Sequence, residues 1–199
     1  MKFHRMLPVV FTTLVFALPV AAKPPAPQGG GQAAPARRFM TMSIKAFADG
    51  AIIPAKYTQA GNQTSPAITW TNAPAGTVTF LLHMHDMEVT RNHTTEDQLH
   101  WLVWNIPATA TGLSEGVPKG SQLGNGAYQI SASGQVYRGP GAPAAGPLHH
   151  YVFELYALDT KVDVQPETDA FATRIAVLKT IQGHVLAKAV YMGRFHRPK

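Results

Sequence analysis

From Phe39 onward, this chain is built of short apolar runs separated by glycine, proline and asparagine. Runs of this length, bounded by residues that favour turns, are typical of β-strands rather than of helices. A chain with many short strands buries its apolar side chains most readily as two packed sheets. The pattern predicts strands at residues 39–47, 67–72, 77–86, 100–106, 127–131, 150–159 and 184–195.

Two of these runs indicate where the core lies. The run 100–106 (HWLVWNI) is apolar on both faces, which predicts a strand in the middle of a sheet. The run 77–86 alternates between two faces, as strand side chains do. Its faces are Val78, Phe80, Leu82 and Met84 on one side, and Thr79, Leu81, His83 and His85 on the other.

One segment, residues 167–182 (ETDAFATRIAVLKTIQ), has a helical period. Thr168 or Asp169 could cap its start, and Gly183 would end it. The fold class predicted is therefore mainly β, an antiparallel β-sandwich with one or two peripheral helices. The apolar residues Phe171, Ile175, Leu178 and Ile181 form the one-sided stripe of this helix, which is expected to face the core.

Composition narrows the classes of protein further. A chain of 199 residues with 45% hydrophobic and 14% charged residues is long and apolar enough for one folded domain, or at most two small ones. The absence of cysteine excludes disulfides, thiolate metal sites and cysteine nucleophiles. The net charge is +6, but the basic residues are scattered without interleaved aromatic residues, so no nucleic-acid surface is expected.

The first 22 residues have the pattern of a secretory signal peptide. A basic start precedes an apolar segment at 7–18, and small residues precede a cut expected after Ala22. Residues 23–37 predict a flexible Pro/Gly/Ala-rich leader, and 38–199 the folded domain. No later run could span a membrane, and no cysteine is present for a lipid anchor, so export to a periplasm or beyond the cell is expected.

Ionisable residues lie at the ends of three predicted strands. Asp86 ends one apolar run, and His100 begins the next. A Gly/Pro-rich segment then leads to His149 and His150, which should point to opposite sides of their strand. These residues predict a small polar pocket at the rim of the β-core, with at most one of the two adjacent histidines in it. His100 could donate to a carboxylate and present its other nitrogen to a ligand.

Interpretations of these residues as a metal site or a catalytic site have less support than a binding pocket. A zinc or copper site could join His83 and His85 to Asp86 and His100, but no further histidine follows at a diagnostic spacing. No serine has the G-x-S-x-G context of a nucleophile, and no phosphate-loop motif is present. We therefore expect no enzyme activity, no catalytic residue, no metal and no cofactor.

Several motifs occur in an order that resembles one family, the phosphatidylethanolamine-binding proteins, in their bacterial Raf-kinase-inhibitor-like branch. The resemblance covers residues 39–197. Its motifs are 65–70 (SPAITW), 85–88 (HDME) in the place of D-P-D-x-P, 100–107 (HWLVWNIP), 139–140 (GP), 149–153 (HHYVF) in the place of H-R-Y, and 183–187 (GHVLA).

The resemblance implies a large central antiparallel sheet packed on a smaller sheet, with a shallow anion pocket at one end. It also implies a ligand of the phosphate type, including the headgroup of phosphatidylethanolamine. Histidine and backbone donors would hold the phosphate, and an acid would hold the ammonium group. Carried over by position, the ligand-binding residues would be Asp86, Glu88, His100, Tyr137, Gly139, Pro140 and His149.

The chain departs from the family pattern at several places. Glu88 replaces the second aspartate of the acidic motif, and Met87 and Thr90 replace its prolines, so the loop should be less rigid. His150 replaces the usual arginine, which removes a permanent cation. Anion affinity carried by the histidines should then rise as the pH falls from about 7.5 to 5.5.

Together these features predict an exported, non-enzymatic binding protein with a pocket for a small anionic ligand or a phospholipid headgroup. The alternative is a protein-interaction module that inhibits a kinase or a protease. A metal-binding or hydrolytic site at Asp86, His85 and His100 has less support. A protein partner and a homodimer both stay open.

Overall fold

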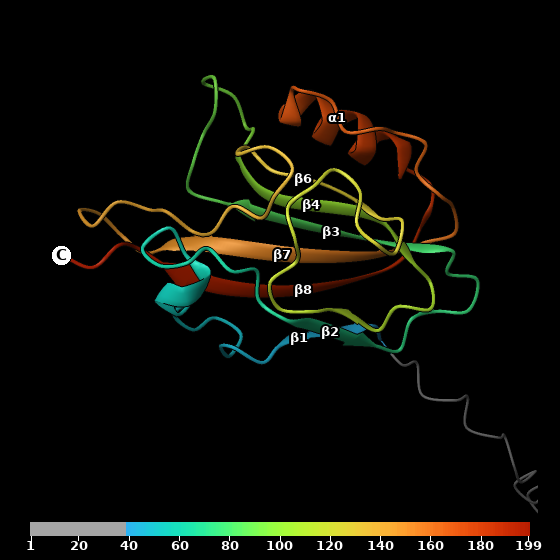
Figure 1. Ribbon diagram of the computed structural model, residues 1–199, viewed down its shortest axis with the longest axis horizontal. Coiled ribbons are helices and arrows are strands. Elements are labelled where there is room, and N and C mark those ends of the chain that lie inside the picture. Colours follow the sequence, from blue (N-terminus) through green and yellow to red (C-terminus); the bar gives the residue numbers. More distant parts are fainter. Residues whose placement is uncertain (1–38) are drawn as a thin grey trace, which may run out of the picture. The chain divides into compact units, whose positions relative to one another are not determined.

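The structure is a computed structural model, and it describes residues 39–199. Two antiparallel sheets face each other, and one helix covers the outer face of the larger sheet (Figure 1). The smaller sheet has the order β1-β2-β5 and the larger sheet the order β6-β4-β3-β7-β8. The elements are β1 (Thr41–Ile44), η1 (Ala55–Tyr57), β2 (Ile68–Thr71), β3 (Thr79–Asp86), β4 (Gln98–Pro107), β5 (Gly112–Leu113), β6 (Tyr128–Ile130), β7 (His149–Leu158), α1 (Ala170–Thr180) and β8 (Val185–Phe195).

The predicted β-sandwich is confirmed, and the predicted strands each overlap a strand of the structure. Two short elements were missed, the strand β5 and the 3₁₀ helix η1. Each has only two or three residues, too few for a hydrophobic period to show. Among residues 39–199, no helix is both long and apolar enough to cross a membrane. The predicted signal peptide and leader (1–22 and 23–37) lie outside the described residues.

The central strands β3 and β4 are buried on both faces because the larger sheet is covered on both sides. Phe80, Leu82 and Met84 pack with the smaller sheet, as the alternation predicts. Leu81 packs on the other face, under α1, with Leu102 of β4. Val78 is the exception: it lies before the strand begins and is 48% exposed. Each Å² of apolar surface buried in this core stabilises the domain by roughly 25 cal/mol.

Helix α1 begins at the predicted cap, but the predicted face is partly wrong. The Asp169 carboxylate accepts hydrogen bonds from the backbone N–H groups of Phe171 and Ala172. Ile175 was expected to face the core, yet it is 53% exposed. The buried face instead contains Arg174, whose guanidinium donates to the Asp97 carboxylate at 2.7 Å. This ion pair makes a buried arginine tolerable, which an apolar stripe alone could not predict.

Two β-bulges interrupt the pairing of β4 with β3. Phe80 pairs with Ile106 and Leu82 with Val103, so two residues of β4 oppose Leu81. One of the two, Asn105, has a positive φ of 59°. Its side chain donates to the carbonyl of Val162 at 2.9 Å and accepts from the same residue's N–H at 2.8 Å. The buried side-chain amide of Asn105 therefore satisfies both backbone groups of Val162.

Replacing Asn105 with alanine should leave both backbone groups of Val162 unpaired in the core. We expect a loss of stability of at least about 2 kcal/mol, since each buried unpaired group costs roughly 1–3 kcal/mol. Asn72→Ala is the matched control, because Asn72 also has a positive φ but is exposed and makes one side-chain bond, to the carbonyl of Phe39. Urea unfolding of the two variants measures the difference. Equal losses would show that backbone strain, not hydrogen bonding, sets the cost.

Candidate functional site

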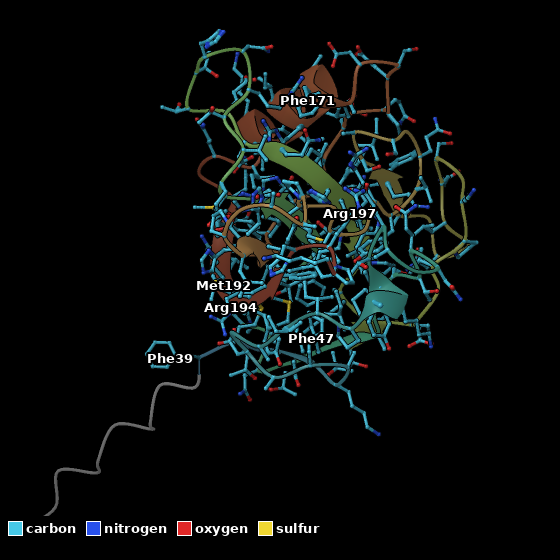
Figure 2. All side chains as sticks on the ribbon, turned by 90° about the vertical axis from the view of Figure 1, so that its left-hand side faces the viewer. Phe39, Phe47, Phe171, Met192, Arg194 and Arg197 are labelled. Atoms are coloured by element: carbon cyan, nitrogen blue, oxygen red, sulfur yellow. The ribbon has the colours of Figure 1, made fainter. Side chains whose placement is uncertain are left out.

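A small pocket of about 170 Å³ lies at the end of the larger sheet, where β3 ends and β7 begins. Figure 2 looks onto this end of the sandwich, with Arg197 between Phe171 of α1 above and Phe47 below. The pocket brings together three of the predicted residues, Asp86, His100 and His149, from three different strands. Its full lining is Gln59, Asp86, Val89, Gln98, His100, Arg138, Gly141, Ala142, Pro143, His149 and Tyr151.

Asp86 and His149 are hydrogen-bonded to each other in the lining of this pocket. The carboxylate accepts from Nδ1 of His149 at 2.9 Å, and it also accepts from the backbone N–H of Glu88 at 3.1 Å. Asp86 is almost fully buried, so a charged carboxylate there requires these donors. As predicted, the adjacent His150 points elsewhere and pairs with Glu88 at 2.5 Å.

The second β-bulge of β4 directs His100 into the pocket. Met84 pairs with Trp101 and His85 pairs with Leu99, so His100 is the extra residue. Its backbone carbonyl accepts from the N–H of Arg138, and its ring Nδ1 donates to the carbonyl of Arg138 at 2.9 Å. The expected bond from His100 to a carboxylate is therefore replaced by a bond to the backbone. In the neutral ring, Nε2 is left as an acceptor.

Burial lowers the pKa of His100 to about 4, although the bond to Arg138 and the nearby Asp86 carboxylate favour the charged ring. His100 is thus neutral throughout the range from about pH 7.5 to 5.5. The expectation that this histidine gains charge and attracts an anion in that range is wrong. The cause is the buried position of the bulge, which charge counting along the sequence does not reveal.

Tyr151 supplies a hydroxyl group beside Asp86. Its oxygen accepts from the backbone N–H groups of Gly141 and Ala142, at 3.2 and 3.1 Å. Burial, and then the charge of Asp86, raise the pKa of Tyr151, so its proton is retained. Because two donors already occupy the oxygen, the hydroxyl proton is free to point toward Asp86 or toward a ligand. Tyr151 follows His150 directly in the family motif, and this position is the signal that could have identified it.

Arg138 places a permanent positive charge at the pocket. Its Nη1 donates to Ser133 at 2.7 Å, while its Nε is buried and has no hydrogen-bond partner within residues 39–199. In the resemblance to the family, His150 replaces the usual arginine, which removes a permanent cation. Arg138, on a neighbouring loop, supplies a positive charge to the pocket instead. Sequence reasoning missed it because loop packing, rather than periodicity, brings it to the site.

Four of the predicted ligand-binding residues do not line the pocket. Glu88 is engaged with His150 at its edge. Tyr137 is buried, donates to the carbonyl of Tyr57 at 2.8 Å and packs edge-on against Trp101. Gly139 and Pro140 contact the segment that follows η1 instead.

Gly139 has a packing role that explains its residue type. A Cβ atom there would lie 2.7 Å from the carbonyl oxygen of Tyr57 and 2.9 Å from Cα of Thr58. Its own carbonyl, like that of Pro140, accepts a hydrogen bond from Gln59. The Gly-Pro pair thereby holds Gln59 at the pocket wall, and the ligand-binding role of Gly139 and Pro140 stays a prediction.

The residues of the alternative metal site are separated by the sheet. Asp86 and His100 lie at the pocket, whereas His85 points to the outer face that carries α1. There it joins His83 of β3 and Glu154 of β7 in a cluster at a different place. The rings of His83 and His85 therefore lie on the face of the larger sheet that carries α1, outside the pocket.

The fold and the site together define the class of this protein: it is a β-sandwich with a small polar pocket at the end of its larger sheet. The model of the phosphatidylethanolamine-binding protein family matches residues 43–196. A UPF0098 protein of Methanothermobacter thermautotrophicus is 36% identical over 160 residues, which are 79% of this chain and 99% of the relative. The chain therefore belongs to the phosphatidylethanolamine-binding protein family.

Solved structures show the same architecture. The PEBP homologue CT736 of Chlamydia trachomatis has a TM-score of 0.66 and 27% identity, covering 80% of this chain and 98% of that chain. YbcL of E. coli shares the fold, with a TM-score of 0.65 and 22% identity over 80% of this chain and 99% of that chain. A relative in Mycobacterium tuberculosis that is named as a lipoprotein, LppC, is 28% identical over 162 residues, 80% of this chain and 76% of the relative.

The ring of His100 should remain neutral at a pH of about 5.5, because its pKa lies near 4 rather than near the usual value of about 6.5. The folded state then binds fewer protons than the unfolded state between these values. The contribution of His100 to stability is fully present above pH of about 6.5 and is lost as the pH falls toward 4. Ring ¹⁵N chemical shifts measure this directly. Titration of His100 near pH 6.5 would contradict the prediction.

Proposed function

We propose that this chain is an exported, non-enzymatic binding protein whose pocket takes a small phosphate-type ligand, in particular one with an ammonium group, such as a phospholipid headgroup. The observation that carries this proposal is the set of mixed charges in one small space. Arg138 offers a positive charge, Tyr151 offers a hydroxyl proton, and Asp86 offers a carboxylate. A zwitterionic headgroup has the complementary groups.

The size of the pocket supports a headgroup rather than a whole lipid. Its volume of about 170 Å³ is below the roughly 300–1,000 Å³ of sites for drug-sized ligands. Acyl chains would have to remain outside it. Among residues 39–199, the lining has no histidine or serine arranged as a nucleophile and base, since Nδ1 of His100 is bonded to a backbone carbonyl and that of His149 to Asp86.

Export is supported by the basic and apolar pattern of residues 1–22 and by the lipoprotein name of the mycobacterial relative. The proposed mature chain begins at Lys23, and its folded domain at residue 38.

Titration with phosphate, phosphoethanolamine and glycerophosphoethanolamine, followed by amide chemical shifts, tests the proposal. We expect saturable shifts at Asp86, Gly141, Ala142 and His149, with phosphoethanolamine bound more tightly than phosphate. No shift with any of the three ligands would overturn the pocket assignment and turn attention to a protein partner at the same rim.

Arg138→Gln should lower the affinity for phosphate by roughly tenfold or more, since a hydrogen bond to a charged group contributes about 1.5–3 kcal/mol. Lys161→Gln is the matched control, because it also removes one positive charge but lies beyond the opposite end of β7. Calorimetric titration of both variants measures the effect. Equal losses in the two would indicate a general effect of net charge instead of a contact.

The substitution Asp86→Asn distinguishes the binding of the phosphate group from the binding of the ammonium group. The substitution removes the negative charge that repels phosphate and attracts an ammonium group. We expect phosphate to bind more tightly to this variant than to the original protein, and the preference for phosphoethanolamine over phosphate to shrink. If the preference is unchanged, Asp86 does not contact the ammonium group. Thermal unfolding of the variant serves as the control for its fold.

A further inference from the structure

We propose that His83, His85 and Glu154 form a binding site for a divalent transition-metal ion, with Zn²⁺ as the best match, on the face of the larger sheet that carries α1. This site is distinct from the anion pocket, because neighbouring residues of β3 point to opposite faces of the sheet. Imidazole nitrogen and carboxylate oxygen are ligands that zinc prefers. Two histidines and one glutamate leave a further position open for water.

The strands place the three ligands by register. His83 and His85 are two residues apart on β3 and share a face, and Glu154 on β7 is the direct partner of His83. The two imidazole rings are stacked, with centroids 4.4 Å apart and planes within 1°. One ligand atom from each of the three residues lies within 4.8 Å of the others.

The distances fit ligands of one ion better than they fit hydrogen bonds. Nδ1 of His83 lies 3.6 Å from Oε2 of Glu154, and Nε2 of His85 lies 3.5 Å from the same oxygen. Hydrogen bonds between nitrogen and oxygen are about 2.7–3.2 Å long. Two atoms that each lie about 2.0–2.2 Å from a tetrahedral zinc ion are separated by roughly 3.4 Å. A small inward movement would thus suffice for binding.

The histidines have unused capacity that hydrogen bonding does not explain. His83 is 5% exposed and His85 is 8% exposed. The Nε2 atoms of both rings are buried and have no hydrogen-bond partner in the part of the chain that the structure describes. Buried polar atoms without partners are uncommon in folded proteins and require an explanation. A bound ion held by Nε2 of His85 and Nδ1 of His83 would explain the orphaned nitrogen of His85.

The residues around the cluster are arranged like those that hydrogen-bond to, and so orient, the ligands of a metal ion. Nδ1 of His85 contacts the Asp97 carboxylate, and Arg174 of α1 fixes that carboxylate from its other side at 2.7 Å. Histidines that bind metals usually present their other nitrogen to a carboxylate in this way. Tyr156 donates to Oε2 of Glu154 at 2.8 Å, and Lys188 pairs with the other oxygen. Lys188 is the opposing charge, but it leaves Oε2 with a lone pair for an ion.

An open cleft of about 570 Å³ beside α1 gives access to this cluster, and His83 and Asp97 form part of its wall. The second group of acids and histidines, Asp86, Glu88 and His149, is less suited to an ion. There each carboxylate already pairs with one histidine, at 2.9 Å for Asp86 and 2.5 Å for Glu88. The buried Nε2 atoms of His83 and His85, which have no partner within residues 39–199, therefore favour the cluster on β3 and β7.

The test is calorimetric titration of the purified, chelator-treated protein, free of any histidine tag, with Zn²⁺ alone. We expect one strong site per chain. His83→Gln and Glu154→Gln should each weaken it by at least about tenfold, and Asp97→Asn by about 10–100-fold, the range found for outer residues of metal sites. His184→Gln is the matched control, because it removes another histidine paired with a carboxylate, Asp159, at an exposed position. It should leave the strong site unchanged.

A second measurement needs no variant and so does not depend on whether the variants fold. In a ring ¹⁵N spectrum of the original protein, Zn²⁺ should shift Nε2 of His85 and Nδ1 of His83, and leave Nδ1 of His149 unmoved. Arg138→Gln should retain zinc binding, which separates this proposal from that of the anion pocket. Absence of a strong site, or shifts at His149 in place of His83 and His85, would overturn it.

Discussion

Both faces of the larger sheet are covered by other elements, and the rest of the structure depends on this constraint. The smaller sheet lies on one side and α1 on the other, so β3 is buried from Thr79 to Asp86. Buried ionisable groups are tolerated only where they are paired or hydrogen-bonded. The charged partners of the polar residues near the end of β3 come from β7 and from the loop that precedes β4, although Nε2 of His83 and of His85 has no hydrogen-bond partner within residues 39–199. Both clusters of charged groups are consequences of this requirement.

The bulges of β4 turn a well-packed strand into one that also serves a site. Without the extra residue opposite Met84 and His85, regular alternation would direct the ring of His100 toward α1. The bulge leaves Leu99 under the helix and places His100 edge-on against Tyr151, with ring centroids 5.0 Å apart. The backbone carbonyl of His100 in the bulge accepts from the N–H of Arg138, so the same irregularity that orients His100 also anchors the loop that brings Arg138 to the pocket.

Periodicity was sufficient to predict the longer strands, and because strand ends converge at the edge of a sheet, it also predicted that Asp86 and His100 meet one of the two adjacent histidines. The family resemblance identified that histidine as His149. Periodicity could not predict that Tyr137 and Gly139 pack inward while Arg138, between them, lines the pocket, since that depends on how a loop without a period folds onto η1. The exposed Ile175 and the buried Arg174 have a similar origin. An ion pair with a distant residue, Asp97, outweighs the apolar stripe of the helix.

Adjacent residues of β3 show how one strand can serve two kinds of chemistry. Asp86 is held by a histidine at hydrogen-bonding distance, which leaves it as a fixed charge in a pocket with other donors. One residue earlier, His85 shares a glutamate oxygen with His83 at the longer separation typical of ligands around an ion. Since both residues are fixed by the same backbone ladder to β7, neither group can move far without disturbing the other. The rigidity of the central strand thus keeps both groups of side chains preorganised, so that the two proposed sites would bind their ligands without rearrangement of the sheet.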